Sequence, residues 1–161
     1  MRDVVLSRID DRLIHGQVMT GWIQFSQASE VVIVDNIVAK DDFTKMVMQS
    51  AMPKKIALSV LSEKQAVEYF LGEENTPGKK YFVLVKTPQV ILNLLNAGVS
   101  IEQVCIGGMG AKANRKTFYR NISASDEERQ AFTDIAAKGS HVFVQVLSDN
   151  APVQLKQIIG G

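Results

Sequence analysis

Short apolar runs alternate with amphipathic segments along this chain of 161 residues, and that alternation constrains its fold more than any other feature. Residues 31–34 form a run of β-branched residues, Val-Val-Ile-Val, that has no polar position and ends at Asp35. A strand of this composition is buried on both faces, which is typical of a parallel sheet covered by helices. We therefore expect a doubly wound α/β fold, with a mostly parallel sheet and helices on both of its faces.

The expected elements follow one another with short connections. Strands are predicted where apolar residues cluster over about 4–8 positions, and helices where apolar residues recur at roughly every third or fourth position. Ser62 with Gln65, and Ser125 with Glu128, have the spacing of capping boxes and mark two helix starts. The predicted strands cover residues 4–9, 31–34, 56–60, 81–85, 104–106, 117–122 and 142–147, and the predicted helices cover 18–25, 41–53, 62–71, 87–98, 125–139 and 153–159.

Composition excludes several classes of protein. Hydrophobic residues make up 46% of the chain and no linker-like stretch divides it, so we expect one domain over residues 1–161. The 18 Lys and Arg residues against 17 Asp and Glu residues lack the basic excess of a nucleic-acid binder. Cys105 alone forms no internal disulfide, and with two histidines it makes no zinc-ligand cluster. Without a signal-peptide pattern or a run of about 18 apolar residues, we expect a cytoplasmic protein that does not insert into the membrane.

The stretch from Ser7 to Gln17 contains two arginines, two aspartates and a histidine between the first strand and the first helix. His15 then lies at the start of the helix, where unpaired N–H groups and the positive end of the macrodipole favour an anion. Gly16 allows close approach of the backbone, and Arg8 and Arg12 add charge-assisted hydrogen bonds. Because the stretch lacks G-x-x-x-x-G-K-[ST] and G-x-G-x-x-G, it indicates phosphate chemistry without a nucleotide loop. The neutral imidazole is a nucleophile suited to accept a phosphoryl group.

Other polar residues are expected at the same edge, beyond the carboxyl ends of the strands. Asp10 either orients His15 and supports the charge gained on phosphorylation, or bonds its own backbone in a turn. Asp11 is expected to be a plain cap or turn residue. The glycines from Gly107 to Gly110, with Lys112, either line the site with N–H groups or form a tight turn. The remaining polar residues at this edge are Asp35, Asn36, Lys86 and Thr87.

Several apolar residues near these loops have two interpretations. Leu13, Ile14 and Met109 either contact a partner protein or pin the loops to the core. His141 is expected at the surface, and Cys105 is expected to be a small buried hydrophobic residue. Three further residues are assigned to the core: Trp22, Met46 and Met48.

The motif Arg8-Ile9-Asp10-Asp11-Arg12-Leu13-Ile14-His15-Gly16-Gln17-Val18 resembles the signature of a known family. That family is the IIB subunit of the mannose/fructose/sorbose type of the phosphoenolpyruvate-dependent sugar phosphotransferase system (PTS). The resemblance extends through Gly107-Gly108-Met109-Gly110 and Val144-Gln145-Val146. It implies a single IIB domain of the mannose/sorbose type, with about seven strands in its sheet. The implied enzyme class is protein-N(pi)-phosphohistidine–sugar phosphotransferase.

By this resemblance, His15 accepts a phosphoryl group from a phosphohistidine IIA protein and passes it to a sugar held by the membrane subunits IIC and IID. Arg12 is implied to reach the phosphoryl group, for which its planar fork is suited. Asp10 is expected to be the other catalytic partner because it lies where the strand ends. No cofactor and no metal are implied. For Arg8, the alternative is a solvated or structurally paired strand residue. The expected phosphate-binding residues are Arg8, Gly16, Gln17, Gly107 and Gly108.

Two other functions are compatible with a doubly wound fold. A receiver-type regulator is phosphorylated on aspartate, and Asp10 and Asp11 follow the first strand, but the third strand ends in Val60-Leu61-Ser62 without an acceptor aspartate. A nucleotide-binding module is disfavoured by the missing phosphate-loop fingerprints. Acid and base lability of the phosphoprotein separates the first alternative from a phosphohistidine carrier, and nucleotide binding separates the second.

Overall fold

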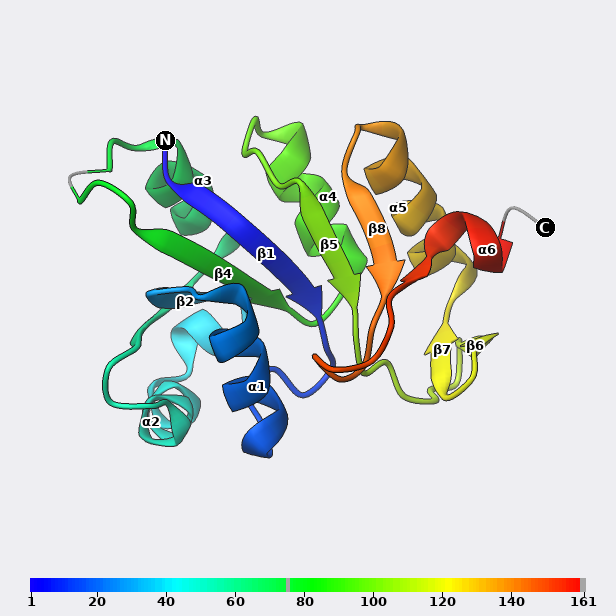
Figure 1. Cartoon of the computed structure of the whole chain (residues 1–161), viewed down its shortest axis with the longest axis horizontal. Coiled ribbons are helices and arrows are strands. Elements are labelled where there is room, and N and C mark those ends of the chain that lie inside the picture. The colour runs from blue at the N-terminus through cyan, green and yellow to red at the C-terminus, as the bar shows by residue number, and fades with distance from the viewer. Residues whose placement is uncertain (75, 160–161) are drawn as a thin grey trace.

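The computed structural model describes residues 1–74 and 76–159, with the backbone alone for Gln17 and Val18. Its main sheet has seven strands in the order β3-β2-β4-β1-β5-β8-β9, which confirms the predicted α/β architecture (Figure 1). The strands pair in parallel except β9, which is antiparallel to β8. They are β1 (Asp3–Ile9), β2 (Glu30–Val34), β3 (Ala57–Leu61), β4 (Lys80–Val85), β5 (Gln103–Ile106), β8 (His141–Val144) and β9 (Val153–Gln154).

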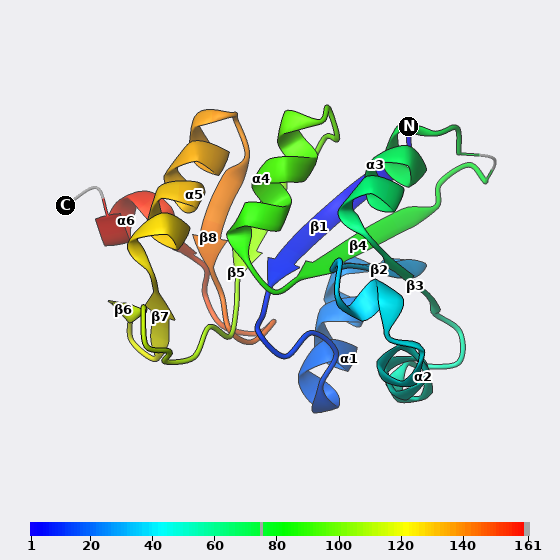
Figure 2. The same cartoon turned by 180° about the vertical axis from the view of Figure 1, so that it is seen from behind.

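Helices cover both faces of the sheet, as the alternation of elements predicts. In Figure 1, α1 (Gly16–Ser26) and α2 (Asp42–Ala51) lie on the near side of the sheet. Figure 2 shows the opposite side with the other long helices, α3 (Glu63–Leu71), α4 (Pro88–Asn96) and α5 (Asp126–Ala137). The chain also contains the short helices η1 (Val38–Lys40) and α6 (Leu155–Ile159).

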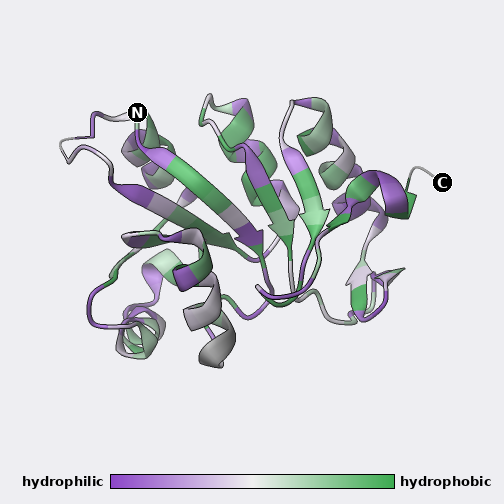
Figure 3. Ribbon diagram, viewed as in Figure 1, coloured by the Kyte–Doolittle hydropathy of each residue, from purple (hydrophilic) through white to green (hydrophobic). Residues whose placement is uncertain are grey.

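Each face of the sheet has its own apolar cluster. Trp22 and Met19 of α1 pack with Leu84 of β4 on one face, and Phe70, Ile91 and other residues of α3 to α5 pack on the opposite face. All five residues of β2 are buried, as expected for a strand covered on both sides. Hydrophobic colouring accordingly concentrates in the sheet (Figure 3). Burial of these side chains supplies the main driving force for this fold.

The two predicted capping boxes are present. The Ser62 hydroxyl accepts from the Gln65 N–H at the start of α3, and the Gln65 side chain accepts from the Ser62 N–H. Ser125 and Glu128 make the same pair of bonds at the start of α5. Because these bonds satisfy N–H groups that a helix leaves unpaired, the local sequence fixes where both helices begin.

Two predicted strands differ from the structure. The single strand expected over residues 117–122 is a hairpin of β6 (Lys116–Tyr119) and β7 (Ile122–Ala124). Arg120 adopts a left-handed φ of 50° there, and the chain reverses direction. The strand expected over 142–147 ends at Val144, and it is not the last strand because β9 follows it. The side-chain amide of Gln145 donates to two carbonyls further along, and these bonds favour a turn over an extended strand.

Predictions about individual core residues had mixed outcomes. Trp22 is fully buried, and Met48 is partly buried against the same cluster, as predicted. The assignment of Met46 to the core is wrong, because its side chain is 62% exposed. It lies on α2, which has no buried residue and presents Phe43 and Val47 to solvent as well. His141 is exposed and Cys105 is buried, both as predicted.

Candidate functional site

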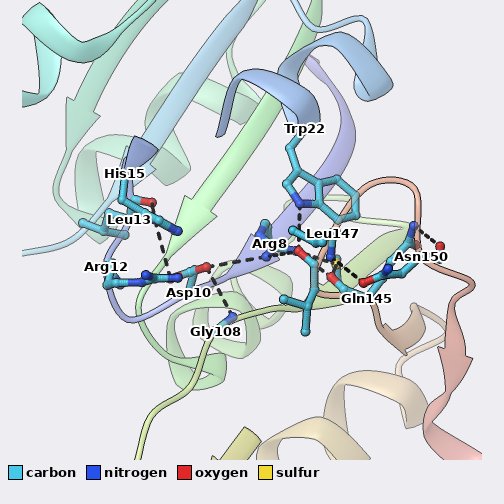
Figure 4. Close-up of polar contacts among 12 residues, drawn as sticks. Arg8, Asp10, Arg12, Leu13, His15, Trp22, Gly108, Gln145, Leu147 and Asn150 are labelled. Atoms are coloured by element: carbon cyan, nitrogen blue, oxygen red, sulfur yellow. Dashed lines mark hydrogen bonds and ion pairs between the residues drawn. The ribbon is translucent and has the colours of Figure 1, made fainter. Parts of the chain in front are cut away.

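Loops from neighbouring parallel strands meet at the carboxyl edge of the sheet, around the end of β1. This strand lies between β4 and β5, and β8 comes next, so the loops after β1, β5 and β8 are brought side by side. From β1 the chain continues to β2, which lies on one side of β1 in the sheet. After β4 it crosses to β5, which lies on the other side of β1. In open α/β sheets, such a change of direction is where ligands bind. Figure 4 shows the polar residues gathered there.

His15 is the residue that precedes α1, and its backbone is extended, with φ −154° and ψ 133°. Its side chain is 18% exposed. Nδ1 lies 3.0 Å from the Leu13 carbonyl oxygen, which only accepts, so this contact places the ring proton on Nδ1. The lone pair is then on Nε2, which is buried and has no hydrogen-bonding partner among the described residues. The backbone carbonyl of Leu13 therefore selects the tautomer of the neutral imidazole in which Nε2 is the nucleophilic nitrogen.

Asp10 lies behind the imidazole and is 1% exposed. Its Oδ1 accepts from the Arg12 N–H at 3.0 Å and lies 4.0 Å from His15 Nδ1. Its Oδ2 accepts from the Gly108 N–H at 3.2 Å. Both expected interactions of this aspartate are thus represented, because it bonds the backbone of its own turn and also faces the imidazole. The ring itself donates its hydrogen bond to the Leu13 carbonyl and not to Asp10.

Arg12 extends from the loop between Asp10 and His15. Its side chain is 65% exposed, and its Nε lies 3.8 Å from Asp10 Oδ1. An ion pair at that distance, with one partner in solvent, restrains the arginine weakly. The guanidinium is therefore able to move to an anion bound near the imidazole, where its fork can bond two oxygens.

Arg8 differs from the phosphate-binding role predicted for it. Its side chain is buried, with Nη1 donating to the Gln145 carbonyl at 2.7 Å and Nη2 donating to the Val146 carbonyl at 2.8 Å. Nη2 also lies 3.5 Å from Asp10 Oδ2. Because these donors are already committed within the protein, the geometry supports the alternative interpretation of Arg8 as a structurally paired strand residue.

The glycine-rich segment after β5 is a tight turn whose N–H groups point into the protein. The Gly107 N–H donates to the Ile9 carbonyl at 2.9 Å, and the Gly108 N–H donates to Asp10. The expected phosphate nest at Gly107 and Gly108 is therefore not supported. Gly107 instead leaves room for Arg8, since a Cβ at this position would lie 2.5 Å from the Arg8 Cζ.

The start of α1 retains the features expected of an anion site. No side chain caps the helix at His15. Gly16 has a φ of +49°, and a Cβ there would meet nothing within 4 Å, so the space above this glycine is open. The positive φ disfavours other residues. The side chain of Gln17, also predicted to bind phosphate, lies outside what the structure describes.

Asp11 has a larger role than that of a plain cap, and its partner Arg115 was not singled out from the sequence. Arg115 donates to both Asp11 oxygens, at 2.8 and 3.0 Å, and to both Glu128 oxygens, at 2.9 Å each. Burial raises the pKa of each carboxyl group, but the hydrogen bonds and charge of Arg115 together with backbone N–H donors outweigh burial, so the pKa values of Asp11 and Glu128 are lowered. The network ties the loop after β1 to α5.

The apolar residues of the loops divide between the two expected roles. Leu13 and Met109 are 0% and 1% exposed, so they pin the loops to the core and do not form a partner surface. Ile14 is partly exposed and packs against the cluster beneath α1. Lys112 is exposed. Leu13 adopts a φ of 56°, which is a left-handed conformation that is strained for leucine. Burial of its side chain offsets the energetic cost of this strain.

Three other residues expected at this edge form polar contacts. Lys86 lies 3.8 Å from Asp35, and Asn36 donates to Glu63. Among residues 1–74 and 76–159, no group of three or more His, Cys, Asp or Glu side chains is arranged to hold a metal ion. No helix in the described part of the chain has the length and apolar composition needed to cross a membrane.

Comparison with known proteins gives consistent matches. The profile of the family described as PTS system sorbose subfamily IIB component matches residues 4–161. The PTS system fructose-specific EIIB component of Bacillus subtilis (strain 168) is 30% identical over 159 residues, which are 99% of this chain and 97% of that protein. The PTS system mannose-specific EIIAB component of Escherichia coli (strain K12) is 27% identical over 154 residues, 96% of this chain and 47% of that protein. The crystal structure of the IIBSor domain of the sorbose permease from Klebsiella pneumoniae has a TM-score of 0.89 at 28% identity, covering 98% of this chain and 96% of that one.

Proposed function

This chain belongs to the sorbose subfamily of PTS IIB components, and we propose that it carries a phosphoryl group on His15 from a phosphohistidine IIA protein to a sugar. The sugar is presented by the membrane subunits IIC and IID. The whole of residues 1–161 acts as one IIB domain on the cytoplasmic side of the membrane. The protein is then both a transferase component and a transient phosphoprotein in sugar transport.

In the first transfer, a ring nitrogen of neutral His15 attacks the phosphorus of the donor phosphohistidine. A new N–P bond forms while the donor's N–P bond breaks, and the donor imidazole leaves with the electron pair. Each imidazole keeps its own N–H proton, so positive charge moves to the ring of His15 together with the phosphoryl group. The carboxylate of Asp10, 4.0 Å from Nδ1, lies where it stabilises that charge.

In the second transfer, a hydroxyl oxygen of the sugar attacks the same phosphorus. The O–P bond forms, the N–P bond breaks, and His15 recovers its electron pair while the hydroxyl proton passes to solvent. Catalysis in both transfers consists of positioning and of neutralising charge on the phosphoryl oxygens. The start of α1 and the guanidinium of Arg12 supply that neutralisation.

The observation that carries this proposal is the placement of His15 at the uncapped start of α1, with exposed Arg12 beside it and buried Asp10 behind it. In the described conformation Nδ1 is bonded to Leu13, and Nε2 is buried. Attack by either nitrogen therefore requires the imidazole to rotate within its loop before it meets a phosphoryl donor.

The name of the mannose-specific relative supports the choice of donor. That protein is called an EIIAB component, which joins an A part and a B part, and the present chain matches 47% of it. A B component that receives a phosphoryl group from an A part needs to contact it during each transfer. We therefore propose that a IIA protein docks transiently at the edge that carries His15.

The alternative is a regulator phosphorylated on aspartate. Asp10 is 1% exposed, and both of its oxygens already accept backbone N–H groups. Asp11 is bonded to Arg115 through both oxygens. Neither carboxylate is presented to a phosphoryl donor, so this alternative has less support than the imidazole.

A pulse–chase experiment tests the carrier function. The protein is labelled through phosphoenolpyruvate, the general PTS proteins and IIA, and is then mixed with vesicles that carry IIC, IID and sugar. We expect label to enter the protein and leave it as sugar phosphate, and His15→Gln to abolish both steps. His141→Gln is the matched control and should behave as wild type. This exposed histidine begins β8 and is hydrogen-bonded to Gln103 at the beginning of β5, so it lies at the opposite end of these strands from the site. Sugar phosphorylation by His15→Gln at the normal rate would exclude the proposal.

A further inference from the structure

The guanidinium of Arg8 contacts two separate parts of the site, and the phosphoryl-transfer mechanism described above does not use it. Arg8 lies on β1 and is 1% exposed. The indole of Trp22 packs against its guanidinium, with Cζ 4.6 Å from the ring centroid. Gly107 packs against it closely enough that any Cβ would collide with it. These neighbours hold the guanidinium in one position.

One part that Arg8 contacts is the carboxylate that faces His15. Nη2 lies 3.5 Å from Asp10 Oδ2, and both side chains are 1% exposed. The other arginine near Asp10 is Arg12, whose side chain is largely in solvent. A buried carboxylate needs a buried counter-charge, and Arg8 provides it. The position and charge of Asp10 near the imidazole therefore depend on Arg8.

The second part is the turn that follows β8. The carbonyls of Gln145 and Val146 accept from the two Nη atoms of Arg8, and the Val146 carbonyl also accepts from Trp22 Nε1 at 3.2 Å. Within the turn, the Leu147 N–H donates to Asn150 Oδ1 at 3.1 Å. The side chains of Val146 and Leu147 are each 43% exposed at this edge. Figure 4 shows Arg8 between this turn and the loop that carries His15.

We propose that Arg8 is a positioning residue for phosphoryl transfer, which fixes Asp10 behind His15 through one contact and fixes the turn of residues 145–150 as part of the partner-docking surface through the others. This inference rests on the proposed carrier function. The Asp10 contact acts on the transfer step itself. The turn contacts act on recognition of the partner protein, because the turn presents apolar side chains to an approaching surface.

A lysine substitution at position 8 can distinguish the effects of the two contacts, because lysine can replace only the contact with Asp10. Lysine keeps a positive charge near Asp10, but it lacks the planar fork that bonds two carbonyls at once. Arg8→Lys should therefore retain the transfer step and lose docking. Gly107→Ala should lose both, because its Cβ would lie 2.5 Å from Arg8 Cζ and Nη2 and would displace the whole guanidinium.

The test uses two phosphoryl donors with the full chain. Phosphoramidate, a small molecule, phosphorylates histidine without docking and reports the transfer step, while the KM for phosphorylated IIA reports docking. We expect Gly107→Ala to slow labelling by phosphoramidate about tenfold and to raise the KM for IIA about fivefold. Arg8→Lys should change the phosphoramidate rate by less than about threefold and raise the KM by about fivefold. The matched control is Ile135→Val, a buried change in α5 that destabilises the protein away from the site.

All rates are compared at temperatures where each variant is fully folded. If Arg8→Lys and Gly107→Ala behave like Ile135→Val in both assays, Arg8 is structural only and the inference is wrong. Equal losses in both assays for Arg8→Lys also contradict it. Should Gly107→Ala fail to fold, Asn150→Ala tests the docking half by removing the bond to the Leu147 N–H, and an unchanged KM would overturn it. Failure of the carrier function itself is distinguishable, since wild-type protein would then take no label.

Discussion

Arg115 donates to both oxygens of Asp11, at 2.8 and 3.0 Å, and so joins the loop that carries His15 to the far side of the glycine-rich turn. The same guanidinium bonds Glu128, which lies in the first turn of α5. The Arg115 side chain is 2% exposed, and those of Asp11 and Glu128 are 19% and 7% exposed. A buried charge with two carboxylate partners fixes the conformation of the loop before any partner arrives.

Replacing Arg115 by methionine should destabilise the protein strongly. The change leaves the buried carboxylate of Glu128 without a counter-charge, and it leaves Asp11 partly so. We expect a loss of about 2–4 kcal/mol in the free energy of unfolding, somewhat below that for breaking a fully buried pair because Asp11 reaches solvent. Urea denaturation at neutral pH measures the loss. The control is Lys112→Met, an exposed cation in the adjacent turn that should cost less than about 1 kcal/mol. Equal small effects of the two changes would show that the network contributes little.

The stability of the protein should also fall in acid through this network. The pKa values of Asp11 and Glu128 are lowered in the folded state, with burial opposing and hydrogen bonds from Arg115 favouring the ionised forms. Groups with a lowered folded pKa contribute stability above their unfolded pKa, which is about 4, and this contribution is lost as pH falls through the folded values. Unfolding free energies measured between pH 7 and pH 2 should decline below about pH 4. The decline should be shallower in Arg115→Met, and an identical acid dependence in that variant would contradict the assignment.

Leu13 should behave as a core residue. Its side chain is fully buried in the cluster beneath α1. Leu13→Ala should therefore lower the free energy of unfolding by about 2–4 kcal/mol, and Leu13→Asp should prevent folding. Ile14→Asp is the contrasting change, because Ile14 is partly exposed. It should fold and weaken binding of IIA. Thermal melting of the three variants makes the comparison, and a stable Leu13→Asp protein would contradict the structure.

Arg12 should matter for transfer and hardly at all for stability. Its side chain is 65% exposed and its nearest ion-pair contact is 3.8 Å long. Arg12→Ala should slow labelling of the protein roughly 100-fold, because the cation acts on charge that develops on the phosphoryl oxygens. The melting temperature should change by no more than about 2 °C. Arg12→Lys should recover part of the rate, since a point charge cannot bond two oxygens in fixed geometry. A large stability loss with near-normal transfer would assign Arg12 to the loop structure instead.

Much of this fold was predictable from local sequence, because its elements obey local rules. The β-branched run of β2, the capping boxes at Ser62 and Ser125, and the periodic apolar residues of α1 each identify an element without reference to the rest of the chain. The position of His15 at a helix start followed from the same rules. Short turns were harder to predict. The hairpin at Arg120 depends on one left-handed residue that the sequence does not mark with glycine.

The roles of the arginines were not predictable in the same way, because each depends on residues far away in sequence. Arg8 is bonded to residues 137 and 138 positions further along, and Arg115 is bonded to Asp11 across 104 positions. Sequence spacing alone gives no sign of these pairs, so it leaves the role of Arg8 open between phosphate binding and a strand residue and does not mark Arg115 as a partner of Asp11. The role of Gly107 was unpredictable for the same reason, since a Cβ at this position would collide with Arg8, which is distant in sequence.

Identification of the phosphorylated residue tests the central claim most directly. The protein is treated with phosphoramidate, digested at alkaline pH to preserve phosphohistidine, and mapped by mass spectrometry alongside His15→Gln and His141→Gln. The account predicts a single phosphoryl group on His15 that is labile in acid, stable in alkali and absent from His15→Gln alone. Phosphate on Asp10 or Asp11 that hydroxylamine removes, or labelling that persists in His15→Gln, would contradict it.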